Sequence, residues 1–208
     1  MRNTLDYNST PLGFLSSFCD LILLNLFFLL SCLPVFTIGA AVSGMYHVNL
    51  RTVRGEGGSV WKLYWEGFRA NFKQATVFWL IFLAVCALLA IDWWVMPVML
   101  PGFYRIPRIM LGMVFLAVCT MILYIFPIVT RFVCTGKQAA KNALLMMAGH
   151  FPWTVLLLLL HGIIPAMCAL SEVFFLYAAC VFLICGFSVI NLVSSHIFHR
   201  ILKRYETI

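Results

Sequence analysis

Charged side chains are scarce in this chain. Asp, Glu, Lys and Arg make up 10% of the 208 residues, and hydrophobic residues make up 63%. Soluble domains carry about 25% charged and about 45–50% apolar residues. So few polar side chains cannot cover an apolar core of this size, which excludes a soluble fold. The lipid bilayer is therefore the expected solvent for much of the surface.

Motifs for catalysis and metal binding are also lacking. The sequence has no Gly-x-Ser-x-Gly, no His-Glu-x-x-His, no phosphate-binding glycine-rich loop and no dinucleotide fingerprint. Its eight cysteines include no Cys-x-x-Cys pair and lie in or beside apolar runs, so we interpret them as small buried hydrophobic residues. We expect no enzymatic activity, no metal and no cofactor. The net charge of +7 comes from basic residues between apolar runs, so nucleic acid is not an expected partner either.

Long apolar runs are what the chain has in abundance. Breaks at charged residues, Pro and Gly divide it into six segments that we predict to cross the membrane as helices, each crossing taking about 20 apolar residues. These segments are approximately 14–33, 35–50, 74–95, 109–130, 153–170 and 174–196. The predicted fold is an all-α bundle of six transmembrane helices, forming a single integral membrane domain over residues 1–208.

The second of these segments leaves an alternative open. It is short, rich in Gly, Ala and Ser, and preceded by Pro34, which disfavours helix at Leu33 and removes a backbone donor. A tight hairpin at 33–37 gives two crossings. A single kinked helix or a re-entrant segment over 35–50 gives five crossings in total instead of six.

The distribution of basic residues predicts the orientation. With six crossings, twelve of the fourteen Lys and Arg residues lie on one side, at the two termini and in the 51–73 and 131–141 connections. Basic residues accumulate on the cytoplasmic side of membrane proteins. We therefore expect both termini to be cytoplasmic.

The most organised polar segment is a predicted amphipathic helix over residues 59–73. Its aromatic residues recur at helical spacing beside a charged stripe, which is typical of a helix lying in the membrane interface. Such a helix either packs against the ends of its own bundle or docks a partner protein. The candidate residues for partner docking or membrane contact are Trp61, Lys62, Trp65, Glu66, Phe68, Arg69 and Phe72.

A fainter copy of this pattern occurs 79 residues later, in a second predicted cytoplasmic amphipathic helix over residues 137–149. Each copy follows a glycine and precedes a predicted crossing. The shared order of crossing, basic amphipathic helix and crossing suggests an internal repeat. The matched positions are Gly136, Ala140, Lys141, Leu144, Met147 and Phe151.

Three polar residues fall inside the predicted crossings. Asp20 lies in the cytoplasmic third of the first, Asn25 nearer its middle, and His161 near the centre of the fifth. Polar groups at these depths are costly, which makes them candidate intramembrane functional residues. The plainer interpretation pairs Asp20 with a basic residue such as Arg51 and hydrogen-bonds a neutral His161 to a neighbouring helix.

Residues 18–82 resemble the YesL-like family of small bacterial membrane proteins. The resemblance rests on Asp20, Asn25, the 34–39 turn, the 51–59 loop and the 68–76 stretch. It implies a multi-pass protein of the bacterial cytoplasmic membrane that accompanies carbohydrate uptake systems, especially sugar ABC transporters. No catalytic or binding residues come with it.

Together these features predict a non-enzymatic accessory or scaffold component of carbohydrate (ABC-type) uptake. The expected partners are the lipid bilayer and sugar ABC transporter subunits. The alternative is a small transporter or channel that acts alone or as a homo-oligomer. A polar path past Asp20, Asn25 or His161 would favour that alternative.

Overall fold

The protein is described by a computed structural model that covers residues 11–99 and 102–203. Within these ranges every regular element is a helix, as the composition predicts. In chain order these are α1 (Pro11–Ser31), the 3₁₀ turn η1 (Val35–Thr37), α2 (Ile38–Val53), α3 (Val60–Met99), α4 (Arg105–Arg131), α5 (Gly136–Gly149), α6 (Phe151–Leu170), α7 (Glu172–Val181), the π-helical segment η2 (Phe182–Gly186) and α8 (Phe187–Leu202).

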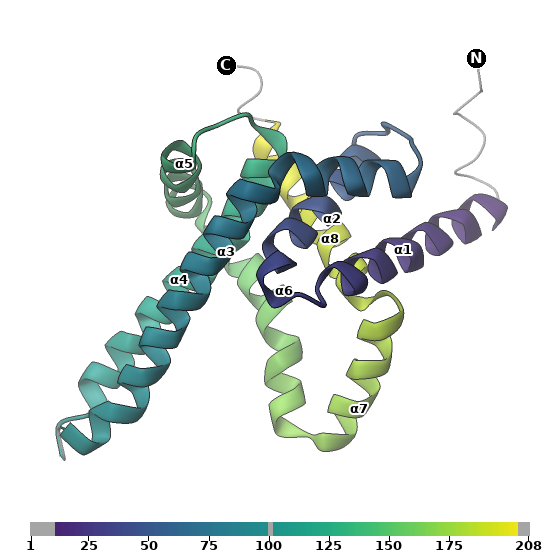
Figure 1. The fold of residues 1–208 in the computed structure, drawn as a ribbon. Coiled ribbons are helices and arrows are strands. Elements are labelled where there is room, and N and C mark those ends of the chain that lie inside the picture. The colour runs from purple at the N-terminus through teal and green to yellow at the C-terminus, as the bar shows by residue number, and fades with distance from the viewer. Residues whose placement is uncertain (1–10, 100–101, 204–208) are drawn as a thin grey trace.

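Four helices are long and apolar enough to cross a membrane, which identifies a helical membrane protein. They are α3, α4, α6 and the continuous helix Glu172–Leu202 formed by α7, η2 and α8. The predicted count of six crossings is not confirmed, because α1 and α2 are not among the four. The predicted segments 59–73 and 74–95 belong to one helix, α3. Figure 1 shows its first part running across one end of the molecule before the rest descends.

The turn between α1 and α2 lies at a different level in the molecule from the turns of the other helix pairs. The end of α3, the start of α4 and the α6–α7 turn all lie toward the same end of the molecule, although well apart from one another, whereas the α1–α2 turn lies partway between the two ends (Figure 1). Sixteen residues of α2 rise about 24 Å at 1.5 Å per residue, less than the roughly 30 Å of a hydrocarbon core. The turn is tightened by Thr37, whose hydroxyl donates to the carbonyls of Ser31 and Pro34.

Close backbone contact joins α2 to α3. A Cβ atom at Gly39 would collide with the backbone of Ala75, and one at Gly67 would collide with the side chain of His47. Only glycine permits this approach, which is the usual way that membrane helices pack tightly. The glycines of the sequence thus place the first part of α3 directly over α2.

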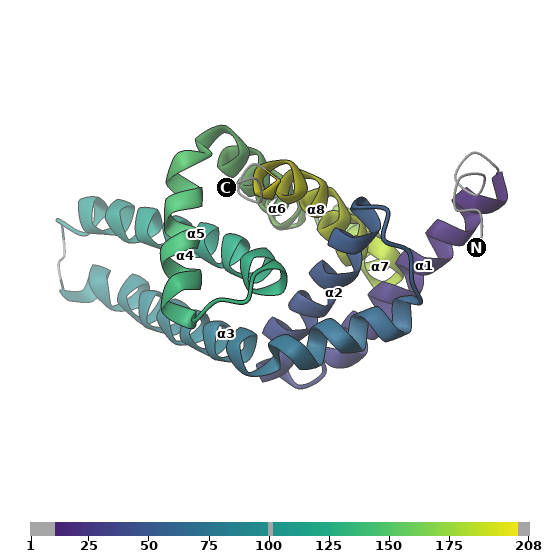
Figure 2. The same ribbon diagram turned by 90° about the horizontal axis from the view of Figure 1, so that it is seen from above.

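The buried core lies at the end of the molecule where α2, α5 and α8 meet the inner end of α4. Large side chains there are almost fully enclosed, including Tyr124 and Phe198. A second buried cluster, formed by α1, α2 and α3, encloses Tyr64. Viewed from above, α5 lies across the α3–α4 hairpin, while α6, α7 and α8 stand on the other side of α2 (Figure 2).

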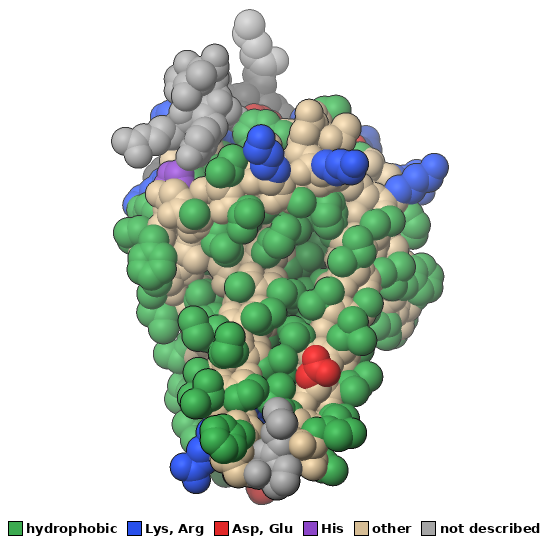
Figure 3. All heavy atoms as spheres, turned by 90° about the vertical axis from the view of Figure 1, so that its left-hand side faces the viewer, with side chains coloured by type: hydrophobic (Ala, Val, Ile, Leu, Met, Phe, Trp, Pro, Cys, Tyr) green, Lys and Arg blue, Asp and Glu red, His purple; other side chains and the backbone are tan. Residues whose placement is uncertain are grey.

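Charge is distributed unequally between the two ends. Figure 3 shows Lys and Arg side chains gathered along one end and hydrophobic side chains covering most of the surface below them. We call the end that carries the 54–59 loop and α5 the basic end. The opposite end carries the α3–α4 and α6–α7 turns.

Candidate functional site

An aromatic ladder runs along the first part of α3. Successive rings of Trp61, Trp65, Phe68 and Phe72 lie 5.6, 5.2 and 5.5 Å apart between centroids. This spacing follows from helical geometry, because residues three and four apart share one face. The ladder therefore brings four of the seven predicted docking residues together.

The ladder is anchored to the rest of the bundle at its start. Trp61 meets Phe27 of α1 edge-to-face, with ring centroids 5.0 Å apart. Tyr64, on the neighbouring face, is fully buried against Gly44 of α2. Trp61 nevertheless remains 53% exposed. Trp65 and Phe68 are partly buried against the same core, so within the ladder the exposed aromatic surface is provided mainly by Trp61.

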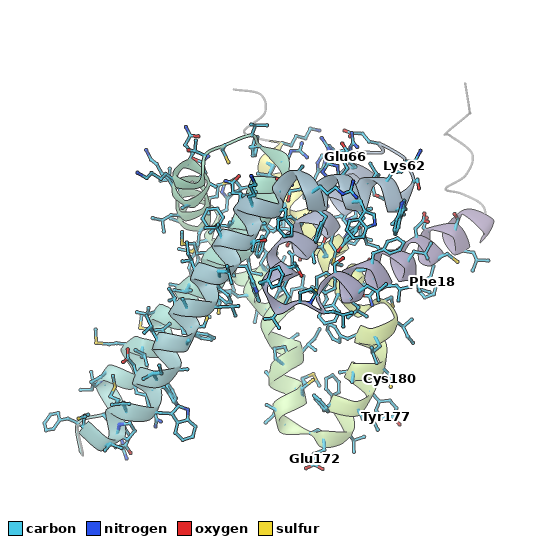
Figure 4. The ribbon with its side chains drawn as sticks, in the orientation of Figure 1. Phe18, Lys62, Glu66, Glu172, Tyr177 and Cys180 are labelled. Atoms are coloured by element: carbon cyan, nitrogen blue, oxygen red, sulfur yellow. The ribbon has the colours of Figure 1, made fainter. Side chains whose placement is uncertain are left out.

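The charged residues of the same segment border a shallow surface hollow. Lys62, Glu66 and Arg69 line it together with Trp61 and Trp65. The Arg69 guanidinium carbon lies 5.9 Å from the Trp65 ring centroid, at the outer limit of a cation–π contact. In Figure 4, Lys62 and Glu66 lie on the first part of α3 at the basic end, far from Glu172 at the α6–α7 turn. The hollow combines aromatic surface with both signs of charge, which is a composition suited to a protein partner.

A network of ion pairs ties the 54–59 loop to this surface. Arg51 lies 3.2 Å from a Glu56 carboxylate oxygen and 3.6 Å from one of Glu66, and Arg54 also pairs with Glu56 at 3.2 Å. These side chains are between about a third and three fifths exposed, so each pair contributes little stability. The network instead orients the loop and Glu66 relative to the end of α2.

The second predicted amphipathic segment is occupied by α5. A capping box between Thr135 and Gln138 begins the helix. Its buried face is formed by Ala139, Ala143 and Met146, whereas Leu144 of the predicted stripe is 52% exposed. The face that packs is therefore rotated by one residue from the face that the repeat pattern indicates.

The loop before α5 is fastened to α3. Gln74 donates a hydrogen bond from its side-chain amide to the Cys134 carbonyl, at 3.2 Å. Burial raises the pKa of the Cys134 thiol above its ordinary value, which keeps the thiol protonated and unreactive at neutral pH. Cys134 is only partly buried. Six of the eight cysteines, Cys134 among them, are partly buried and Cys19 and Cys180 are exposed, so the prediction that all eight are buried is wrong.

The Asn25 side chain forms hydrogen bonds with the backbone in and next to the π-helical segment η2. Its amide nitrogen donates to the carbonyls of Phe182 and Leu183, at 2.9 and 3.0 Å, and its amide oxygen accepts from the Ser188 backbone at 3.2 Å. A π-helical segment shifts the backbone hydrogen-bond register, which leaves backbone carbonyl and N–H groups without their usual helical partners. The predicted intramembrane candidate therefore satisfies the backbone of a helix more than 150 residues away.

The other two polar candidates lie apart from Asn25. Asp20 is exposed on α1, and Arg51 pairs with Glu56 and Glu66, so the expected Asp20–Arg51 pair is not formed. His161 donates from Nδ1 to the Leu157 carbonyl of its own helix, at 2.9 Å, and not to a neighbouring helix. The structure does not bring Asp20, Asn25 and His161 into one site.

Two buried contacts were not anticipated from the sequence. Asn49 donates from its side-chain amide to that of Asn191 at 2.8 Å, joining α2 to α8, and Tyr124 bonds to Thr154 at 2.8 Å, joining α4 to α6. Asn49 and Asn191 lie 142 positions apart, so no local spacing pairs them. The signal available was the presence of Asn within apolar runs. Across residues 11–99 and 102–203, no group of three His, Cys, Asp or Glu residues is placed to hold a metal ion.

Part of the chain is similar to a family of unknown function. The sequence profile of a family described as "Protein of unknown function, DUF624" matches residues 21–93. This stretch overlaps residues 18–82, on which the predicted family resemblance rests, and it includes Asn25, the ion-pair network and the aromatic ladder. Neither the curated proteins nor the solved structures gave a match.

Proposed function

We propose that the protein is a non-enzymatic accessory component of a membrane transport assembly, and that it docks a partner subunit through the hollow lined by Trp61, Lys62, Trp65, Glu66 and Arg69. The observation that carries this proposal is the construction of that surface. Trp61 and the charged residues Lys62, Glu66 and Arg69 are exposed on a helix whose other face packs closely against α1 and α2. A rigid aromatic surface loses little conformational entropy on binding.

The class of partner follows from the resemblance of residues 18–82. It implies association with carbohydrate uptake of the ABC type, so the proposed partner is a membrane or cytoplasmic subunit of such an importer. The chemistry of the hollow is compatible with a protein surface that carries both an apolar side chain and a charged rim.

The proposed location is the bacterial cytoplasmic membrane with the basic end in the cytoplasm. α1 and α2 then form a re-entrant hairpin that enters and leaves from the cytoplasmic side. This topology has four crossings, and it keeps the predicted cytoplasmic position of both termini. Its support is the depth of the α1–α2 turn and the shortness of α2.

Cysteine labelling tests the hairpin. In a cysteine-free background, we expect Phe36→Cys in the α1–α2 turn to resist a membrane-impermeant maleimide added outside the cell, although Phe36 is 52% exposed. The matched control Phe103→Cys, in the α3–α4 turn and 79% exposed, should react. Equal labelling of the two positions would show instead that the second predicted segment crosses the membrane.

Charge reversal tests the docking surface. The double variant Lys62→Glu/Arg69→Glu should reduce recovery of importer subunits about tenfold after crosslinking in native membranes, because complementary charges at a rim govern association. The control Lys137→Glu/Lys141→Glu makes the same change on exposed positions of α5 and should leave recovery unchanged. Recovery of the chain without any importer subunit would refute the proposal.

A transporter or channel acting alone is less well supported. Asn25 uses both ends of its amide within the bundle, Asp20 is exposed on the outside of α1, and the space beside His161 is lined mostly by apolar side chains. A hydrophilic substrate would need groups along its path that replace its hydration.

A further inference from the structure

A large cavity lies between the α3–α4 hairpin and the α6–α7 hairpin, which we call the outer hairpins. Its volume is about 670 Å³, within the roughly 300–1,000 Å³ of pockets that hold small molecules. Side chains from α1, α2, α3, α4, α6, η2 and α8 line it, so it is a feature of the whole bundle and not of one helix pair. Its walls belong largely to the crossing helices, so an occupant reaches it most directly from the bilayer.

The lining is nearly all hydrocarbon and aromatic. Representative wall residues are Phe82, Phe115, Ile122, Leu158 and Ile164. Such a surface cannot hydrogen-bond a polar substrate, and it favours an apolar chain over water. The bulk of the occupant is therefore hydrocarbon.

Most of the polar side chains at the cavity already have partners. Trp79 donates to the Val35 carbonyl at 2.9 Å, Tyr46 is hydrogen-bonded to Ser194, and Asn191 accepts from Asn49. These contacts hold α3 to the α1–α2 turn and α2 to α8. They belong to the scaffold of the cavity.

His161 is the exception. Its Nδ1 donates to the Leu157 carbonyl, which can only accept. In the neutral ring, which an apolar site favours, Nε2 then carries a lone pair and acts as an acceptor. No residue in the described part of the chain bonds to Nε2.

Two prolines increase the acceptor character of the same walls. Pro165 and Pro127 have no N–H, so the helix cannot supply its usual donor to the carbonyls four residues earlier, at His161 and Leu123. Both of those residues line the cavity. Within a membrane, carbonyls without a helical donor favour another donor.

We propose that this cavity binds a neutral lipid whose hydrocarbon chain fills the apolar space and whose hydroxyl group donates to Nε2 of His161. A hydroxyl supplies a donor to Nε2, which no residue in the described part of the chain provides. A charged headgroup would be placed against hydrocarbon without a counter-ion, which is costly. This site is independent of the proposed docking surface at the basic end.

Photoaffinity labelling tests the proposal. The full-length protein in phosphatidylcholine nanodiscs is labelled with a diazirine-bearing hexadecan-1-ol, and the crosslinks are mapped by mass spectrometry. We expect the crosslinks on cavity residues to be displaced by unlabelled hexadecan-1-ol about tenfold more effectively than by hexadecyl methyl ether, which keeps the chain but cannot donate. Equal competition by the two compounds would overturn the role of His161.

Two variants test separately the binding of the lipid hydroxyl group and of the lipid hydrocarbon tail. His161→Phe keeps an aromatic ring but removes the acceptor, so the preference for the alcohol over the ether should disappear while labelling persists. Gly162→Phe should abolish cavity labelling, because a Cβ at Gly162 meets no atom within 4 Å and a phenyl group can enter the space. The control Gly112→Phe lies on α4 outside this cavity, has equally open surroundings and should label normally.

The folded state of each variant is checked by its elution as a single species in size-exclusion chromatography. Labelling spread evenly over lipid-facing residues of the outer hairpins, and unaffected by Gly162→Phe, would show only nonspecific contact with lipid and would refute a binding site.

Discussion

The two ends of this molecule differ in how much of their side-chain surface is buried within the protein. At the basic end, α2, the end of α4 and the end of α8 bury most of their side chains against one another. In the outer hairpins few side chains are buried, and Leu88, Met113 and Leu176 are each more than 60% exposed. The basic end is stabilised by contacts within the protein. The outer hairpins are instead surrounded by lipid and by the proposed occupant of the cavity between them.

The kinds of residue at the two ends match this difference. Gly, Ser and Asn allow close approach and hydrogen bonding between helices at the basic end, and bulky aliphatic residues cover the outer hairpins. Association of helices in lipid depends on close packing and on hydrogen bonds, because lipid tails are as apolar as the side chains themselves. Substitutions should therefore have large effects at the basic end and small effects in the outer hairpins.

The largest effect is expected from Gly67→Leu. The new side chain collides with His47 and separates α3 from α2, which should destabilise the protein by about 3 kcal/mol. Reversible denaturation in mixed detergent micelles measures this change. The control Gly112→Leu in the outer part of α4 meets no atom near its Cβ and should be neutral or slightly stabilising. Equal losses from both variants would contradict the contrast between the two ends.

Asn25→Leu should rank second. It removes three hydrogen bonds to the π-helical segment, worth about 0.6 kcal/mol each on average in membrane proteins, for a total of about 2 kcal/mol. Asn71→Leu is the matched control, since the Asn71 amide donates to the Gly67 carbonyl within its own helix, and should cost no more than about 0.5 kcal/mol. The same denaturation assay compares them, and a neutral Asn25→Leu would mean that the π-helical segment needs no support from α1.

The Asn49–Asn191 contact should show a smaller coupling. A double-mutant cycle with alanine at both positions is expected to give about 1 kcal/mol of interaction energy, because the two amides are hydrogen-bonded to each other across α2 and α8. A cycle on Leu88 and Leu176, which are exposed on separate hairpins, should be additive within about 0.5 kcal/mol. Strong coupling between those two leucines would indicate that the outer hairpins contact each other.

The smallest effect is expected from Arg51→Gln. Its ion pairs with Glu56 and Glu66 are partly exposed, so their loss should cost less than about 1 kcal/mol and should shrink further at high salt. Unfolding measured at low and high ionic strength checks this. A loss as large as that of Gly67→Leu would assign the ion pairs a structural role that their exposure argues against.

Some of these features were predictable and others were not. The positions of the long helices follow from apolar runs, and the aromatic ladder follows from the spacing of Trp61, Trp65, Phe68 and Phe72 along one helix. The roles of Asn25 and Asn191 were not predictable, because their partners lie on helices far away in the chain. The buried face of α5 lies one residue away from the stripe matched by the repeat, and it consists largely of small alanines that allow close packing.

The sequence by itself determined that this is an all-helical membrane protein, because its composition admits no other solvent and its apolar runs mark where the long helices lie. It also set the basic character of one end, through the positions of Lys and Arg. Tertiary structure alone decided that α1 and α2 meet partway through the bundle, that an asparagine supports a distant π-helical segment, and that His161 lines an apolar cavity. Each of these depends on which helices become neighbours. Close packing and hydrogen bonding between distant segments determine which helices are neighbours, and the hydropathy pattern does not predict these contacts.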